Sequence, residues 1–482
     1  MSDPLAVLPY ALAAGGGRVD GHDARELVAA GLTLLRRSAP LVRALAGRRA
    51  AILLPTSPQF VVALAACEGR GAVLVNPLAA PREVAYQLAD ADVGAAFTVR
   101  ALAAKLPPDL PRVLLDDAPR SAEVTVGGDA RAVDLASHGA GDVLDLAGDA
   151  AAEGRDEEAA VVYTSAMAGR PLGAVLTHRN LVANGRATVE AGAFTAADHA
   201  LAVLPFSHLF GLVVSGVAPL FAGGRVTTME RFHPIKAADL IARAGVTAVV
   251  GVPAVFAALL QAAERRGGLA GSALRVCICG GAPLPVALQE RWHAATGVEL
   301  RQGYGLTEAG PVCLFNRVDR PNKLGTLGVP FPGVDVAVLD PATGAECAPG
   351  AEGEICVRGP NVGPGYVRDG ALGLGRRGPR GEWLRTGDLG ARDAEGYVTF
   401  RGVCKPMFTR NGFNIYPREL EAAVRELPGV RAVRVRAVPE PAREHDIALD
   451  VTGGVTAEAV TAWCAERLSA YKQPSEVTVA AG

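Results

Sequence analysis

Hydroxyl-bearing and small residues gather in residues 163–180, YTSAMAGRPLGAVLTHRN, a segment whose composition suits contact with phosphate. Thr164 and Ser165 follow the apolar run AAVV, and glycines and a proline precede a helix expected near Asn180. Small residues let backbone N–H groups approach phosphate oxygens, and hydroxyl groups add further donors. This pattern predicts a phosphate loop between a buried strand and a helix.

Carboxylates also occur in two later glycine-containing motifs, QGYGLTE (302–308) and WLRTGDLG (383–390). Glu308 offers a hard oxygen ligand, and the carboxylate of Asp388 can accept two hydrogen bonds together. The alternatives are that Glu308 is a surface carboxylate and that Asp388 caps its own turn. Glycines in GGAPLP (280–285) would let a planar ligand approach the backbone, or would simply end a strand.

An α/β framework is predicted to position these motifs. The expected strands cover 50–55, 72–76, 94–99, 247–253 and 274–281, and the expected helices cover 59–71, 82–91 and 236–245. Alternation of this kind predicts parallel sheets covered by helices. Between residues 340 and 401 the short strands and Gly/Pro turns predict a small β-barrel.

A domain boundary is expected near residues 401–405. Beyond it, a helix over 416–427, an alternating strand over 431–439 and a helix over 456–471 predict a compact α+β unit of roughly eighty residues. We therefore expect residues 1–402 to form a large N-terminal body of several subdomains, with parallel sheets, helices and the small barrel. Residues 403–482 are expected to form a small α+β C-terminal lid.

Composition sets limits on the class of protein. A chain of 482 residues, 50% of them apolar, can bury a large core, and its net charge of −2 gives no electrostatic case for nucleic acid or an anionic membrane. The eight cysteines show no paired spacing, and Cys277 and Cys279 should face the same side of a buried strand. The apolar stretch 201–224 contains prolines and glycines, which favour a core strand–loop–helix over a membrane span. No basic segment opens the chain, so we expect no secretory signal and a cytoplasmic protein.

Seven motifs occur in a characteristic order. They are the phosphate loop, LPFSHLFG (204–211), GGAPLP (280–285), QGYGLTE (302–308), GEICVRGPNVGPGY (353–366), WLRTGDLG (383–390) and NGFNIYPRELE (411–421). Together they resemble the acyl-adenylate-forming superfamily, which includes acyl-CoA synthetases and other AMP-dependent synthetases and ligases. The resemblance covers almost the whole chain and implies ATP or AMP, Mg²⁺ and CoA as ligands.

The resemblance also implies roles for single residues. Thr307 would donate to the α-phosphate, Glu308 would hold Mg²⁺, and His208 would lie beside the substrate carboxylate and gate access of CoA. A lone histidine in an apolar segment is otherwise a satisfied core group. Tyr304 would offer its ring to the adenine, or be a core aromatic residue. The nucleotide-binding residues implied are Thr164, Ser165, Gly280, Gly281, Ala282, Tyr304, Gly305 and Asp388.

Three departures from the family pattern remove cations or donors. Leu172 stands where the phosphate loop would present a lysine, and Ala-Met-Ala replaces its Gly-Thr-Thr run. The family's hinge-region arginine aligns with Val403, although Arg401 or Arg410 could reach the site instead. Lys405 aligns with the hinge residue or is an exposed loop lysine. The sequence ends in YKQPSEVTVAAG, before the family's Gly-Lys element, so adenylation is expected to be impaired, by about 10²–10³-fold for each cation lost.

Three functions are open from the sequence. The first is a carboxylic acid–CoA ligase that forms an acyl-adenylate and then a thioester. The second is a relative that uses a ready-made adenylate or joins the acyl group to an amine or a carrier-protein thiol. The third is a non-catalytic homologue that retains partial AMP binding. No acid stands near His208 to pair an α-ammonium group, and VPAVF (252–256) and LFGLVV (209–214) are apolar, so a fatty or aromatic acid is favoured. A homodimer is compatible with the sequence.

Overall fold

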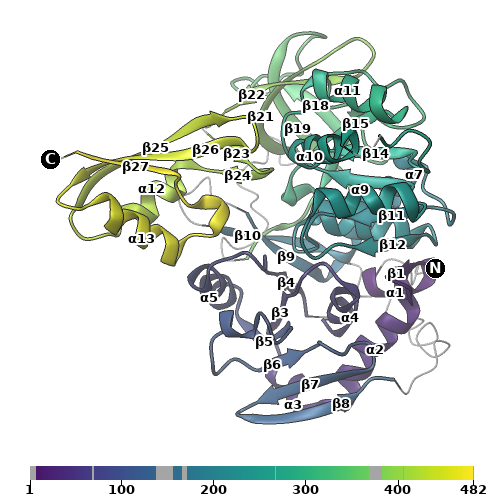
Figure 1. Ribbon diagram of the computed structural model, residues 1–482, viewed down its shortest axis with the longest axis vertical. Coiled ribbons are helices and arrows are strands. Elements are labelled where there is room, and N and C mark those ends of the chain that lie inside the picture. Colours follow the sequence, from purple (N-terminus) through teal and green to yellow (C-terminus); the bar gives the residue numbers. More distant parts are fainter. Residues whose placement is uncertain are drawn as a thin grey trace.

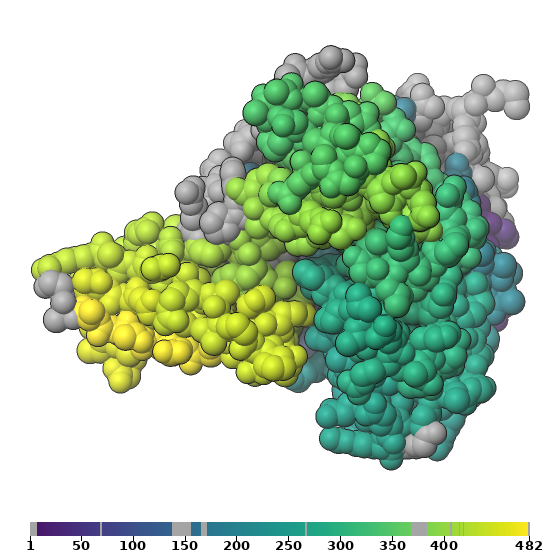
Figure 2. Space-filling view, turned by 90° about the horizontal axis from the view of Figure 1, so that it is seen from above, coloured from purple at the N-terminus to yellow at the C-terminus, as the bar shows by residue number. Residues whose placement is uncertain are grey.

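The computed structural model describes residues 7–67, 70–136, 156–164, 171–265, 268–367, 383–404 and 407–480. A large body contains two nine-stranded sheets and a smaller four-stranded sheet. A smaller C-terminal unit, which we define as residues 407–480, projects to one side of this body (Figures 1 and 2). The predicted α/β class is confirmed.

The first nine-stranded sheet is mostly parallel, and its strand order is β17-β16-β15-β14-β13-β11-β12-β1-β2. Its strands are β1 (Arg18–Val19), β2 (His22–Asp23), β11 (His199–Ala202), β12 (Arg225–Thr228), β13 (Ala248–Gly251), β14 (Val276–Cys279), β15 (Leu300–Gly305), β16 (Val312–Phe315) and β17 (Val329–Pro330). The pairs from β1 through β12, β11, β13 and β14 to β15 are parallel, whereas β16, β17 and β2 add antiparallel edges.

Helices cover both faces of this sheet. Successive side chains of a strand point to opposite faces, and alternate residues of the central strands pack in two different apolar clusters. Val249, Cys277 and Cys279 pack with α9 (Pro234–Arg243), α10 (Pro253–Glu264) and α11 (Val286–Thr296). Val250 and Ile278 pack on the other face, with α7 (His178–Gly192) and the π-helix Phe210–Val217. The prediction that the two cysteines share one side of a buried strand is confirmed.

The second nine-stranded sheet has the strand order β20-β10-β9-β4-β3-β5-β6-β7-β8. Its strands are β3 (Arg49–Leu53), β4 (Ala72–Leu74), β5 (Val93–Thr98), β6 (Arg112–Leu114), β7 (Ser121–Val126), β8 (Asp129–Asp134), β9 (Glu158–Thr164), β10 (Leu172–Thr177) and β20 (Gly365–Tyr366). Its helices are α1 (Leu8–Gly15), α2 (Ala24–Arg37), α3 (Ala39–Ala44), α4 (Pro58–Ala66) and α5 (Pro81–Asp90). The predicted strands and helices between residues 50 and 99 are all present, although α4 ends at Ala66 rather than near residue 71.

The segment predicted as a small barrel forms a four-stranded antiparallel sheet of order β18-β19-β21-β22. These strands are β18 (Asp335–Leu339), β19 (Glu352–Arg358), β21 (Leu384–Arg392) and β22 (Val398–Val403). The stretch 201–224 contains β11, the π-helix and α8 (Ala218–Phe221), as expected for core. Among the described residues no helix is both long and apolar enough to cross a membrane.

The C-terminal unit combines a hairpin, a three-stranded sheet and two helices. The hairpin is β23 (Phe408–Arg410) and β24 (Phe413–Ile415), the sheet is β25 (Val430–Glu440), β26 (Glu444–Gly453) and β27 (Glu476–Ala480), and the helices are α12 (Pro417–Arg425) and α13 (Ala457–Arg467). The last helix is shorter than the predicted 456–471. Leu468 adopts an extended backbone, and Ala470–Lys472 form a separate 3₁₀ turn.

Candidate active site

One cavity of about 640 Å³ lies where the body meets the C-terminal unit. Its walls come from the ends of β9, β14 and β15, the start of the π-helix, β21 and the C-terminal unit. The predicted site residues that line it are Thr164, His208, Gly280, Gly281, Ala282, Tyr304, Gly305, Thr307, Glu308 and Asp388. Ser165 lies outside the described residues.

Tyr304 and Asp388 are in direct contact in the wall of this cavity. The Tyr304 hydroxyl donates to Asp388 Oδ2 over 2.7 Å, which joins the end of β15 to β21. Burial, followed by the nearby Asp388 carboxylate, raises the pKa of Tyr304, so the phenol stays protonated and remains a donor. The two residues are therefore held in a fixed relation.

Glu308 lies in a short 3₁₀ turn, Thr307–Ala309, directly after β15. Its side chain is buried, and its Oε1 accepts a hydrogen bond from the Tyr366 hydroxyl. The turn requires Gly305, because a Cβ atom at that position would lie 1.8 Å from the carbonyl oxygen of Pro311. The Glu308 carboxylate at the cavity wall is thus held in place by the Tyr366 hydroxyl.

The loop after β14 brings backbone close to the cavity. Gly281 has φ +78°, which favours glycine, and a Cβ at Gly280 would lie 3.1 Å from Phe210 Cζ. Both glycines and Phe210 of the π-helix line the cavity, so this strand end forms one of its walls.

His208 precedes the π-helix and contributes its ring to the cavity wall. Its Nδ1 accepts from the backbone N–H of Phe210 over 3.2 Å. Although the ring is accessible from the cavity, protein surrounds its other sides, and this desolvation lowers the pKa of His208. The ring is consequently neutral at pH 7 and presents no positive charge to a substrate.

The ends of the predicted phosphate loop are described, but residues 165–170 are not. Thr164 Oγ1 donates to the carbonyl of Leu172 over 3.4 Å, and Leu172 starts β10 without lining the cavity. Two tyrosines anchor these ends to α5. Tyr163 donates to Asp90 Oδ2 over 2.7 Å, and Tyr86 donates to the carbonyl of Pro171 over 2.9 Å.

The two arginines proposed as substitutes at the hinge do not line the cavity. Val403 does line it, whereas Arg401 is exposed elsewhere. Arg410 is buried within the C-terminal unit, where it forms an ion pair with Asp446 over 2.8 Å. Lys405 lies outside the described residues.

Each described cation at the cavity wall already has a carboxylate partner. The three pairs are Arg82–Glu426 at 2.9 Å, Arg467–Glu466 at 2.6 Å and Lys472–Glu419 at 2.6 Å. The described part of the cavity therefore offers little uncommitted positive charge to a triphosphate.

Sequence reasoning missed two contributors. Tyr366 ends a motif that was recognised, but only the structure brings its hydroxyl to Glu308. The sequence did not mark Glu83 as a site residue, because a glutamate in the first turn of a helix commonly serves only to cap that helix. The structure pairs it with Lys472 of the C-terminal unit.

Comparison with known proteins decides the family. A family model described as AMP-binding enzyme matches residues 40–367, which is more than half of the chain. The chain belongs to the AMP-binding enzyme family. Within this family, a long-chain-fatty-acid–CoA ligase of Bacillus subtilis (strain 168) is 30% identical over 469 residues, covering 89% of this chain and 81% of the relative.

Two further members of the AMP-binding enzyme family are similar. A feruloyl-CoA synthase of an Amycolatopsis species is 32% identical over 453 residues, covering 89% of this chain and 84% of the relative. A malonyl-CoA ligase, solved as a ternary product complex with methylmalonyl-CoA and AMP, superposes with a TM-score of 0.79 at 28% identity, covering 100% of this chain and 99% of that one. This AMP-binding enzyme is thus an acyl-CoA ligase-like member of the adenylate-forming superfamily.

Proposed function

We propose that the protein is a carboxylic acid–CoA ligase-like enzyme that activates a fatty or aromatic acid through an acyl-adenylate. The observation that carries the proposal is the shared cavity, in which Tyr304 and Glu308 of one motif meet Asp388 of another, about eighty residues further along the chain. In this proposal residues 1–402 form the AMP-binding body and residues 403–482 form a lid.

The nucleotide would occupy the side of the cavity formed by β14, β15 and β21. Gly280, Gly281 and Ala282 leave room for the adenine plane beside the Tyr304 ring. Asp388, held by Tyr304, would accept from the ribose hydroxyls. Catalysis in such a site is mainly positioning of the carboxylate and stabilisation of charge at the α-phosphorus.

Glu308 fits a Mg²⁺ ion. It is a hard oxygen donor at the cavity wall, and its orientation is fixed by Tyr366. Mg²⁺ commonly takes one or two protein carboxylates together with substrate phosphates, so a larger ligand cluster is not needed. When bound, the ion would neutralise phosphate charge, and Thr307 would donate to the α-phosphate.

The apolar part of the acid would pack against the cavity wall that is formed by apolar side chains. Phe210, Val214, Ile278 and Phe315 line the cavity together. His208, neutral because of its surroundings, would sit beside the carboxylate without neutralising it. The fatty-acid and feruloyl specificities named for the two relatives support a fatty or aromatic acid.

The position of the C-terminal unit supports a role after adenylation. The chain superposes on the product-bound malonyl-CoA ligase with a TM-score of 0.79, compared with 0.67 for the ATP-bound MatB from Rhodopseudomonas palustris at the same identity and the same coverage of this chain. This difference supports the arrangement seen here as the one for acyl transfer to a thiol. A second candidate is therefore an enzyme that consumes a ready-made adenylate. This second candidate is favoured because every described cation of the cavity wall is already paired with a carboxylate. Little positive charge is therefore left to bind the triphosphate of ATP.

Two measurements test the proposal. Pyrophosphate release with ATP–Mg²⁺ across fatty and aromatic acids should show turnover, and calorimetry should show binding of AMP and of a non-hydrolysable acyl-adenylate mimic. Binding of AMP and the mimic without pyrophosphate release would favour the second candidate. Failure of AMP and the mimic to bind would contradict both.

A further inference from the structure

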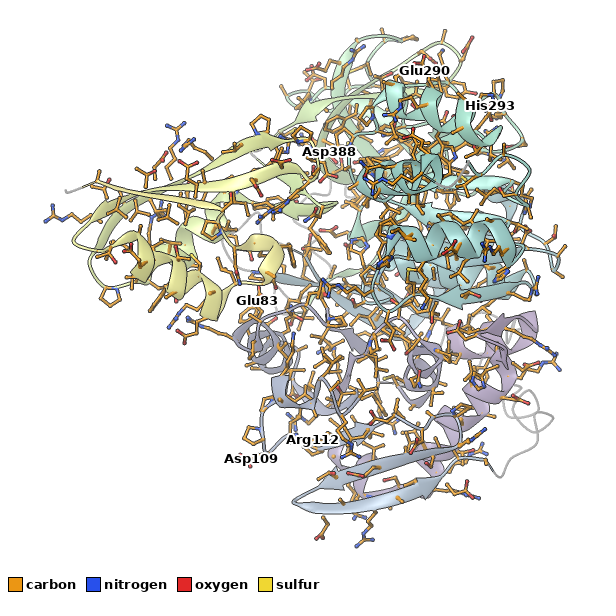
Figure 3. The ribbon with its side chains drawn as sticks, in the orientation of Figure 1. Glu83, Asp109, Arg112, Glu290, His293 and Asp388 are labelled. Atoms are coloured by element: carbon orange, nitrogen blue, oxygen red, sulfur yellow. The ribbon has the colours of Figure 1, made fainter. Side chains whose placement is uncertain are left out.

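We propose that Glu83 and Lys472 form a latch that holds the C-terminal unit against the body, and that Lys472 is thereby a positioning residue for acyl transfer. This inference rests on the proposed function for its consequence in turnover, but the latch itself can be tested without activity. Figure 3 shows Glu83 on α5 at one end of the border with the C-terminal unit and Asp388 at the other end.

The latch is a buried charge cluster built from both parts of the molecule. Lys472 Nζ lies 2.6 Å from Glu419 Oε1 and 3.2 Å from Glu83 Oε1. The three side chains are only 6%, 7% and 14% exposed, respectively. Ser469 also donates to Glu83 Oε2, so two groups of the C-terminal unit grip one carboxylate of the body. Interactions of this kind are stronger than exposed ion pairs, because they are less screened and charge-assisted.

The cluster is built so that it can separate. Lys472 and Glu419 both belong to the C-terminal unit, so Lys472 keeps one carboxylate partner if the unit moves away. Glu83 belongs to α5, where its Oε2 also accepts from the backbone N–H of Ala80 over 3.0 Å. Opening therefore exposes Glu83 to water and leaves no unpaired charge buried, which avoids the large penalty for breaking a buried ion pair.

A rigid connection links the latch to the β23–β24 hairpin at another part of the cavity wall. Tyr471, next to Lys472, stacks on Phe413 with ring centroids 4.2 Å apart. Arg410 reinforces this contact by donating to the carbonyls of Tyr471 and Gln473, over 3.3 and 2.6 Å. The 3₁₀ turn that carries the latch and the β23–β24 hairpin thus form one piece.

The hairpin makes the second contact with the body. Gly412 has φ +75°, and its carbonyl oxygen lies 3.7 Å from a Cβ built at Gly281. A Cβ at Gly412 would lie 2.5 Å from Val252 Cγ1, so the hairpin sits directly on the loops at the strand ends. Gly412 and Phe413 both line the cavity. Two anchors, one at the strand ends near Val252 and Gly281 and one at α5, therefore set the orientation of the same piece.

We test the latch with Glu83→Gln. Glutamine keeps an acceptor for Ala80 and removes the charge, so α5 should remain folded. Donor and acceptor dyes are placed on the exposed positions 109 and 434 by Asp109→Cys and Arg434→Cys, with Cys347 and Cys404 changed to serine, since the other six cysteines are buried. Energy transfer then reports the distribution of body-to-unit distances.

We expect Glu83→Gln to shift the ratio of latched to unlatched molecules by about tenfold or more, because it removes hydrogen bonds to a charged group. Arg82→Gln is the matched control for this distance measurement. Its ion pair with Glu426 joins the same two parts, but the side chains are 53% and 56% exposed, so the distribution should not change. Gly412→Ala should displace the hairpin from Val252 and so disrupt the other anchor. It should shift the distance distribution in the same direction as Glu83→Gln.

The kinetic readout starts from pre-formed acyl-adenylate plus CoA. Glu83→Gln should slow this half-reaction by about the factor measured for the latched population, and it should slow it more than it slows pyrophosphate release from ATP. An unchanged distance distribution in both Glu83→Gln and Gly412→Ala overturns the latch. A shifted distribution with no turnover by the wild type retains the latch and instead contradicts the proposed function.

Discussion

The hydroxyl of Tyr304 and the carboxylate of Asp388 lie 2.7 Å apart, although β15 and β21 belong to different sheets of the body. The contact closes one wall of the cavity. It also fixes the direction of the Asp388 carboxylate before any ligand arrives, and such preorganisation lowers the entropy lost on binding.

Tyr304→Phe is expected to weaken AMP binding about tenfold, because Asp388 loses the donor that orients it while the aromatic ring is kept. Calorimetry with AMP measures the change. Tyr397→Phe is the matched control, since the Tyr397 hydroxyl donates to the carbonyl of Pro321 over 2.8 Å and does not line the cavity. Equal AMP affinities for wild type and Tyr304→Phe would show that the Tyr304 hydroxyl does not orient Asp388 for AMP binding.

Glu308→Gln should abolish the benefit of Mg²⁺ for ATP binding while leaving AMP binding within about twofold of wild type, because a neutral amide is a poor ligand for a hard cation. Calorimetry with ATP, with and without Mg²⁺, measures this difference. Tyr366→Phe is the graded companion, since it keeps the carboxylate and removes its hydrogen bond. We expect an intermediate effect; the same loss of AMP affinity in both variants would mean that Glu308 is structural.

The core of the fold could be predicted because buried parallel strands are continuous apolar runs. β3, β5 and β14 were found in this way, and the motifs that follow such strands were placed at one cavity. The hairpin β7–β8 was not predicted. Most residues of β8 are exposed, so no apolar alternation marks it.

Contacts between distant segments could not be predicted from the sequence. Tyr366 and Glu308, like Glu83 and Lys472, are paired by packing of separate elements, and no local pattern carries that information. The role of Arg410 was open for the same reason. Its guanidinium looked available to the cavity, but the fold uses it to fix Tyr471 and Asp446.

Gly280→Ala tests which wall accepts the acid. The added Cβ would lie 3.1 Å from Phe210 Cζ and from the carbonyl oxygen of Gly303, so the aromatic ring must move into the cavity. We expect kcat/KM for aromatic acids to fall about tenfold, since a single methyl group changes discrimination by this order. AMP affinity should fall less, because only one edge of Gly280 borders the proposed adenine position. Gly454→Ala is the control, because nothing lies within 4 Å of its Cβ. A uniform loss for short and bulky acids would place the acid elsewhere.

His178 is expected to make stability depend on pH. It is buried at the start of α7, where its Nδ1 accepts from the backbone N–H of Leu8 over 3.2 Å. Burial lowers the pKa of His178 to about 4, whereas the unfolded chain should titrate near its ordinary value of about 6.5. As pH falls below that value the unfolded state binds the proton first, so the free energy of unfolding decreases.

Between about pH 7 and pH 5 this single group should lower the free energy of unfolding by about 2 kcal/mol. Urea denaturation at both pH values measures the loss. His178→Gln retains an acceptor for Leu8 without a titratable ring, so its unfolding free energy should fall less over the same interval. The exposed His293→Gln serves as the control and should keep the wild-type dependence. Identical pH dependence in His178→Gln and wild type would show that the ring is not held neutral by its burial.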